Sequence, residues 1–223
     1  MTRRHIHIII FLLLSMAIAQ LQAQFDEEVF EELSSEAGLS STVVTCILKD
    51  SHGFMWFGTQ NGLNRYDGYN FTTYKHSDTV TNSISGNYIL SVFEDSEKNI
   101  WVGTQSNGLN KYNRNKNNFE IFRNDSSNSE SISSDNIRIV MQTSDSNLYF
   151  GTGKGVNIYD AVNKSFQILS LPEEKQDLNS LPINELFQDS DGSIWIGTSN
   201  GLFQFLPENN DLIEFYHDPQ NSN

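Results

Sequence analysis

Short apolar runs alternate with clusters of Gly, Asn, Asp and Ser along the chain beyond residue 38. The first group of runs falls at residues 43–48, 54–58, 63–66 and 71–74. Between them lie segments of turn-forming residues at 50–53, 60–62 and 67–68. Runs of this length, bounded by such segments, are typical of β-strands joined by tight turns. The pattern therefore predicts four short strands, of which the continuous run 43–48 is buried on both faces.

The same pattern returns three more times. The repeated blocks are FMWFGTQNGLNRYD (54–67), NIWVGTQSNGLNKYN (99–113), LYFGTGKGVNIYD (148–160) and SIWIGTSNGLFQF (193–205). Their shared glycines, Gly58, Gly103, Gly151 and Gly197, are 45, 48 and 46 residues apart. The corresponding inner strands are expected at 89–93, 137–141 and 183–187, and the outer ones at 119–122, 166–169 and 212–216. This period fits one four-stranded blade of a β-propeller.

The fold class is thus all-β, with very little helix, and the architecture is a β-propeller of four four-stranded blades in an incomplete ring. The predicted segments are a signal peptide (1–23), an N-terminal segment (24–38), blade 1 (39–78), blade 2 (79–126), blade 3 (127–173), blade 4 (174–217) and a connector (218–223). A single sheet cannot cover both of its apolar faces, so each blade must stack between neighbours.

Two sets of residues hold equivalent places in every unit. The aromatic set is Trp56, Trp101, Tyr149 and Trp195. The favoured interpretation is that these side chains fill the wedge between blades, and the alternative is a ring of sugar-stacking aromatics. The glycines come in two series, one for close approach of the backbone to the next blade and one for positive φ at a hairpin. The second series is Gly62, Gly108, Gly155 and Gly201.

Composition and charge argue against one class of function, the binding of nucleic acid. Aromatic residues make up 12% of the chain and hydrophobic residues only 37%, and the formal net charge is −14. No Lys/Arg cluster follows residue 4, so the chain lacks the basic stripe that nucleic-acid binding requires. The acidic surface is interpreted as a solubilising one.

The N-terminus has the features of an export signal. Arg3 and Arg4 precede an apolar run at 8–18, which is shorter than a membrane-spanning helix, and small residues follow. Cleavage is expected after Ala19 or after Ala23, with a mature start at Gln24 favoured, and an uncleaved anchor is the alternative. The predicted location is the periplasm.

No motif predicts catalysis, a cofactor or a metal. Residues 151–155 (GTGKG) look like a phosphate-binding loop but align with the hairpins of the other units, and Asp189 to Gly192 begins like a calcium loop but lacks its distal ligands. His52, His76 and His217 show no ligand spacing, and Cys46, the single cysteine, is interpreted as a buried small residue. We find no charged residues that break the repeat and would converge in the central channel, and acids brought together only by folding stay open as the alternative.

The pattern of an apolar strand, D-x-x-G, (I/F)W(I/V/F)GT, G-L-x-x-Y-D and F-x-x-Y resembles the two-component regulator propeller repeat from Leu39 to Tyr216. The third unit departs from it, with Thr143 in place of Asp, Tyr149 in place of Trp and Val156 in place of Leu. The resemblance implies the periplasmic sensor region of a hybrid two-component system histidine kinase, an oligosaccharide ligand and self-association through propellers. The membrane would be reached only through a downstream helix.

Intact members of that family resemble two seven-bladed propellers followed by a β-sandwich, a transmembrane helix and a kinase, so this sequence is expected to be an N-terminal fragment without catalytic parts. Residues 25–33 are suggested to supply the outer strand of a closing blade. Ligand sensing is the leading hypothesis. Its rivals are a scaffold for protein partners, a periplasmic propeller enzyme of the lyase or quinoprotein-like type, and an ectodomain that serves a diguanylate cyclase.

Overall fold

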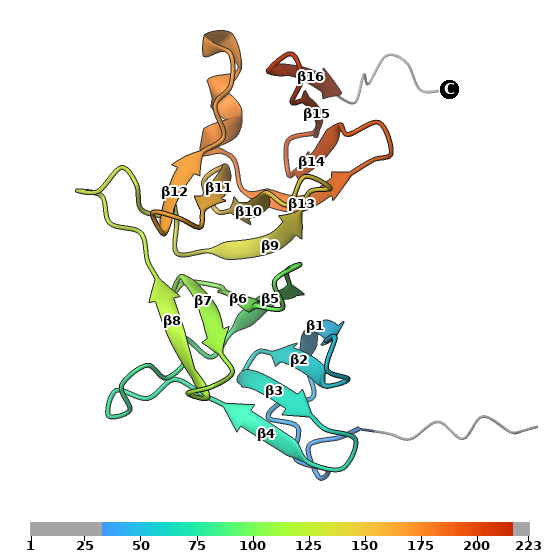
Figure 1. The fold of residues 1–223 in the computed structure, drawn as a ribbon, viewed down its shortest axis with the longest axis vertical. Helices are drawn as coiled ribbons and strands as arrows, with labels where there is room; N and C mark the ends of the chain where they lie inside the picture. Colours follow the sequence, from blue (N-terminus) through green and yellow to red (C-terminus); the bar gives the residue numbers. More distant parts are fainter. Residues whose placement is uncertain (1–32, 216–223) are drawn as a thin grey trace, which may run out of the picture. The chain divides into compact units, whose positions relative to one another are not determined.

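The computed structural model describes residues 33–215, which form four antiparallel sheets of four strands each (Figure 1). In every sheet the strands are hydrogen-bonded in chain order, as β1-β2-β3-β4 in the first sheet. The prediction of an all-β protein made of four-stranded blades is confirmed. We number the blades 1 to 4 along the chain.

The strands lie where the apolar runs placed them, within one or two residues at each end. Blade 1 contains β1 (Val44–Lys49), β2 (Met55–Thr59), β3 (Gly62–Tyr66) and β4 (Phe71–Tyr74), and blade 2 contains β5 (Ile89–Glu94), β6 (Ile100–Thr104), β7 (Leu109–Asn113) and β8 (Asn118–Phe122). Blade 3 contains β9 (Ile137–Gln142), β10 (Leu148–Thr152), β11 (Val156–Asp160) and β12 (Ser165–Ile168), and blade 4 contains β13 (Ile183–Gln188), β14 (Ile194–Thr198), β15 (Leu202–Leu206) and β16 (Asp211–Phe215).

The first strands of the blades, β1, β5, β9 and β13, contact one another in that order. Each pairs with the second strand of its blade through one register shift at its N-terminal end, between Val44 and Cys46 in blade 1 and between Ile89 and Ser91 in blade 2. The repeat therefore fixes a β-bulge as well as the strands, and such a bulge bends the inner strand.

The cores lie between blades. One buried cluster joins blades 1 and 2 around Trp56 and Ile89, a second joins blades 2 and 3 around Trp101 and Ile137, and a third joins blades 3 and 4. Blades 2 and 3 thus share both apolar faces with neighbours, as the thinness of a single sheet requires. The first strand of blade 1, predicted to be buried on both faces, is instead largely exposed at Val44 and Ile47, because no described blade lies on its other side.

Helical structure is confined, within the described residues, to one 3₁₀ segment, η1 (Glu173–Ser180), which precedes the first strand of blade 4. The predicted signal peptide, the suggested closing strand at 25–33 and the connector at 218–223 fall largely or wholly outside the described residues. No helix in the described part of the chain is long and apolar enough to span a bilayer.

Candidate functional site: the seams between blades

The repeated tryptophans are held by hydrogen bonds from their indoles as well as by packing. Trp56 Nε1 donates to Asp50 Oδ2 at 2.9 Å, and Trp101 Nε1 donates to Asp95 Oδ2 at 2.8 Å. Trp195 makes the equivalent bond to the acid of its own blade, Asp189. The acid belongs to the turn between the first two strands, so the D-x-x-G element and the tryptophan of the repeat form one unit. In the sequence alone, the D-x-x-G turn and the tryptophan appear as two separate features of the repeat.

The third unit lacks both partners of this bond. Thr143 stands in the place of the acid and Tyr149 in the place of the indole. The Thr143 hydroxyl instead donates within its own turn, to Asp145 and to the backbone oxygen of Asn147. An aspartate buried in this position without the indole donor would lose a hydrogen bond. We therefore interpret the replacement of Asp by Thr143 and of Trp by Tyr149 as linked.

The aromatic side chains lie between blades, except in blade 4. Trp56 and Trp101 are fully buried and Tyr149 is nearly so. Trp56 contacts Tyr112 of the next blade, and Trp101 contacts Phe150 and Tyr159 of the next. Trp195 is only partly buried and lies against Phe215 of its own blade.

The glycines of the first series leave room for the following blade. A Cβ on Gly58 would lie 2.8 Å from Ile89 Cγ2, and one on Gly151 would lie 2.8 Å from Ile183 Cγ2. At Gly103 it would lie 2.6 Å from the backbone oxygen of Ile137. The second series has positive φ throughout: Gly62, Gly108, Gly155 and Gly201.

We call the boundary between two consecutive blades a seam. One hydrogen bond crosses all three seams at the same place: the amide of a turn serine donates to the side chain that ends the next blade's inner strand. The pairs are Ser51 with Glu94, Ser96 with Gln142, and Ser144 with Gln188. The first seam uses a carboxylate as acceptor and the other two use an amide, so the seams share this contact but differ in charge.

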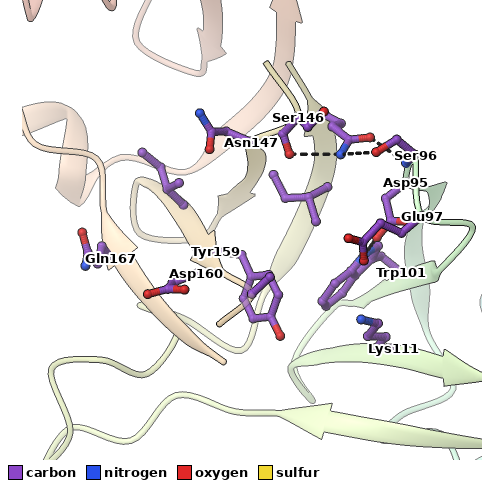
Figure 2. Close-up of a pocket in the computed structure, with 14 residues that line it drawn as sticks. Asp95, Ser96, Glu97, Trp101, Lys111, Ser146, Asn147, Tyr159, Asp160 and Gln167 are labelled. Atoms are coloured by element: carbon purple, nitrogen blue, oxygen red, sulfur yellow. Dashed lines mark hydrogen bonds between the residues drawn. The ribbon is translucent and has the colours of Figure 1, made fainter. Parts of the chain in front are cut away.

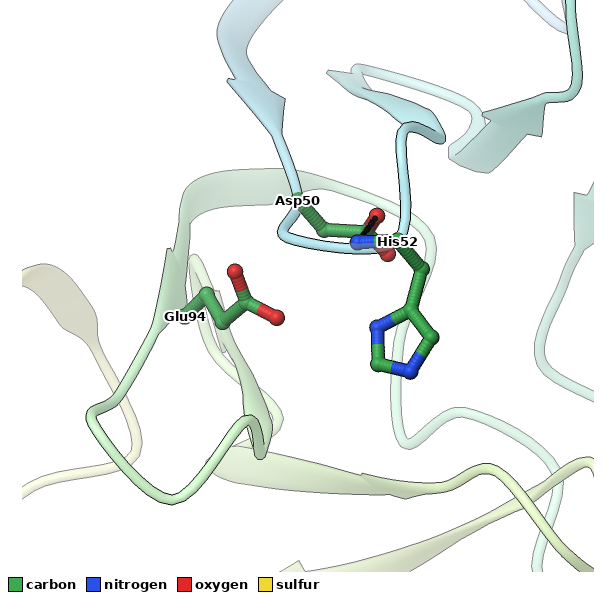
Figure 3. Close-up of side chains that lie close together, drawn as sticks. All are labelled: Asp50, His52 and Glu94. Carbon is green, nitrogen blue, oxygen red and sulfur yellow. Dashed lines mark hydrogen bonds between the residues drawn. The ribbon is translucent and has the colours of Figure 1, made fainter.

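The first seam contains an ion-pair network, whose two carboxylates, Asp50 and Glu94, are drawn in Figure 3. Arg114, from the turn between β7 and β8, donates to Asp50 Oδ2 from both terminal nitrogens at 3.1 Å and to Glu94 Oε1 at 3.3 Å. The Asp50 side chain is fully buried. Burial alone would raise the pKa of Asp50, but hydrogen bonds from Trp56 and the Phe54 amide, and the Arg114 guanidinium, together lower the pKa below its usual value.

His52 joins this seam, which its sequence context did not predict. Donor atoms of Asp50, His52 and Glu94 lie within 4.8 Å of one another, a spacing that could hold a metal ion. Both carboxylates, however, already accept hydrogen bonds from Arg114 and from backbone amides. Arg114 therefore supplies the positive charge that a bound metal ion would provide to these two carboxylates. Acids brought together only by folding were left open by the sequence, and Asp50 and Glu94 are such a case, because they come from different blades and meet at Arg114.

The second seam contains a cavity of about 440 Å³ in place of the ion pairs (Figure 2). Asp95, Glu97 and Lys111 line it from blade 2, and Gln142 and Asp160 line it from blade 3. A second, wider hollow of about 950 Å³ lies over blade 2 and is lined by five asparagines, Asn82, Asn99, Asn113, Asn115 and Asn118. Charged side chains also border it, among them Lys98, Lys116 and Glu120.

The remaining sequence candidates occupy structural places. Residues 152–155 form the hairpin between β10 and β11, and residues 189–192 form a turn in which Asp189 accepts the indole of Trp195. His76 lies 3.1 Å from Asp78, and His217 is outside the described residues. Cys46 packs against the core shared by blades 1 and 2, and burial raises the pKa of its thiol to about 11.

Three segments of the chain match the two component regulator propeller model, at residues 38–61, 83–106 and 177–200. Each begins before an inner strand and ends in the hairpin after the W-x-G-T element. These three segments are similar to the two component regulator propeller repeat. The third unit is not among the matched segments, and it is the unit that lacks the Asp and Trp pair.

Other proteins with similar sequence or fold include members of signalling systems. The chain is 35% identical over 82 residues to Histidine kinase P4 of Formosa agariphila, an alignment that covers 37% of this chain and 6% of that protein. It superimposes on the extracellular domain of the putative hybrid two component system BT3049 from B. thetaiotaomicron with a TM-score of 0.61 and 25% identity, over 83% of this chain and 32% of that one.

A virginiamycin B lyase from Staphylococcus aureus shares the fold, with a TM-score of 0.55 and 14% identity over 77% of this chain and 55% of that one. The chain therefore spans 6% of the kinase and about a third of the solved ectodomain.

Proposed function

We propose that this propeller region senses a ligand outside the cytoplasm for a two-component regulator and that the ligand is an oligosaccharide. The observation that carries the proposal is the likeness to the extracellular domain of a putative hybrid two component system, together with the regulator propeller repeats. The extracellular position of that domain supports the proposal that the propeller meets external solutes.

The hollow over blade 2 supports a polar ligand. Amide side chains both donate and accept hydrogen bonds, which suits the paired hydroxyl groups of a sugar. Five asparagines border this hollow, and among them Asn115 is exposed and makes no hydrogen bond in the described residues through its side chain. A volume of about 950 Å³ exceeds that of one monosaccharide, which favours a chain of two or more units.

Calorimetric titration of the full chain with purified oligosaccharides, chosen from a glycan array, tests the proposal. We expect saturable binding that is lost in Asn115→Trp, where the indole would fill the hollow. Asn209→Trp, on an exposed turn of blade 4 away from the hollow, is the matched control and should bind as the wild type does. Absence of any saccharide binding would contradict the proposal and favour a scaffold for protein partners.

A further inference from the structure

The cavity at the second seam occupies the place that Arg114 fills at the first. Arg114 follows the last residue of β7, and Ala161 follows the last residue of β11. In the same way, Asp95 is the counterpart of Asp50 as the indole acceptor, and Gln142 is the counterpart of Glu94 as the seam acceptor. All three counterparts, Asp95, Gln142 and Ala161, line the cavity (Figure 2). The second seam has the site of the first without its guanidinium.

The acid at the bottom of this cavity is buried without a cation. Asp95 is only 4% exposed, and within the described residues it forms no ion pair. Its oxygens accept the Trp101 indole and the amide groups of Asn99, which are neutral donors. A buried carboxylate is costly unless an opposite charge accompanies it. At the first seam Arg114 supplies that charge, and at the second no residue of the seam does.

The neighbouring charges add to this deficit. Where the first seam has His52 and Asn113, the second has the carboxylates of Glu97 and Asp160, both of which line the cavity. The ammonium of Lys111 lies over the Trp101 ring at 5.0 Å, which is where Arg65 lies over the Trp56 ring in the first seam. A cation at the Arg114 position is therefore compatible with one at the Lys111 position, because the first seam holds both.

We infer that the cavity between blades 2 and 3 binds a small organic cation, a guanidinium or ammonium group on a short alkyl chain, in the place that Arg114 takes between blades 1 and 2. The cation would pair with Asp95, and its stem would pass Ala161 toward the acids at the cavity mouth. This site is separate in residues and in charge from the proposed saccharide hollow, apart from the shared border at Glu97 and Lys111.

Nuclear magnetic resonance of the tryptophan indole N–H groups tests the inference directly, because the Trp101 indole is bonded to the oxygen that the cation would approach. The probe is agmatine, which carries a guanidinium and an ammonium, and its neutral shape-matched control is N-butylurea. We expect saturable movement of the Trp101 signal with a dissociation constant on the order of 1 mM, since ligands this small bind weakly. The signals of Trp56 and Trp195 should stay in place.

Two variants make the test specific. Ala161→Arg supplies the guanidinium from the chain and should abolish the agmatine response, while its own Trp101 signal shows that the seam is still formed. Asp160→Asn keeps an oxygen for the two backbone amides of the turn, gives up the hydrogen bond from Asn163 Nδ2 and removes one charge, and it should weaken binding by about threefold to tenfold. The inference is overturned if agmatine moves no indole selectively, if butylurea acts equally well, or if the response survives in Ala161→Arg.

Discussion

The first and third seams close the same wedge with different chemistry. Between blades 1 and 2, Trp56 is bonded to Asp50, and Arg114 neutralises that acid. Between blades 3 and 4, the equivalent positions hold Tyr149, Thr143 and Pro207. The third seam gains apolar contacts instead, since Leu171 and Leu178, beside and within η1, join its buried cluster.

Two contacts are common to both seams. A glycine of the second strand lies against an isoleucine of the next blade, and a serine amide donates to the end of the next inner strand. The comparison teaches that the repeat conserves the shape of the wedge and leaves its charge free to vary. Charge is thus the property by which one seam can acquire a site that another lacks.

The largest expected effect is the loss of the cation from the first seam. Arg114→Ala would leave the Asp50 carboxylate buried beside Glu94 without a cationic partner. We therefore expect the free energy of unfolding to fall by about 3 kcal/mol. Urea denaturation of the full chain measures this. Arg138→Ala removes a cation that has no ion-pair partner in the described residues and should change stability by less than about 0.5 kcal/mol. Equal effects of the two variants would show that the ion pairs contribute nothing.

The shared shape predicts equal sensitivity at the two seams. Gly58→Ala and Gly151→Ala would each crowd a methyl group against a side chain of the same blade, Cys46 or Ile139, and against the next blade's isoleucine, and each should lower the free energy of unfolding by about 2 kcal/mol. Gly197→Ala is the matched control, because its Cβ would meet nothing closer than Glu185 Cβ at 3.4 Å. A large difference between the first two variants in urea denaturation would break the claim of a common wedge.

The smallest effect comes from transferring the indole bond to the third unit. Thr143→Asp alone should destabilise the protein, because it buries a carboxylate that has no indole donor. Adding Tyr149→Trp should recover about 1 kcal/mol of the loss, the value of one hydrogen bond. A double-mutant cycle by urea denaturation measures this coupling. A coupling energy of zero would mean that the two departures of the third unit are independent.

Sequence reasoning succeeded where residues repeat. Three copies of the W-x-G-T element and the equivalent YFGT of the third unit located the strands, and the spacing of Gly58 from Gly103 set the size of the blade. It did not find the pair of Asp50 and Trp56, although the joint loss of both residues in the third unit was visible as Thr143 and Tyr149.

It could not find the first seam's charges or the second seam's cavity. Arg114 and Asp50 are 64 residues apart, and only one of the four units has an arginine at the position of Arg114. No repeated pattern in the sequence therefore marks their contact. Ala161 has no feature that marks it as a site residue in the sequence. It matters only because it stands where the second unit has Arg114. Sites that arise by departure from a repeat become visible only when the blades are superimposed on one another.

Cys46, the single cysteine, can report the transient separation of blades 1 and 2. Cys46 Sγ faces Gly58 at the joint of the first two blades, and its thiol is held in the unreactive protonated form. Because Cys46 is partly buried and its thiol is protonated, alkylation by a maleimide is slow while this seam is closed and faster when the two blades separate for a moment, so the labelling rate reports that separation. Any occupant that tightens or loosens the stack would register as a change in that rate, without an added dye or a second mutation.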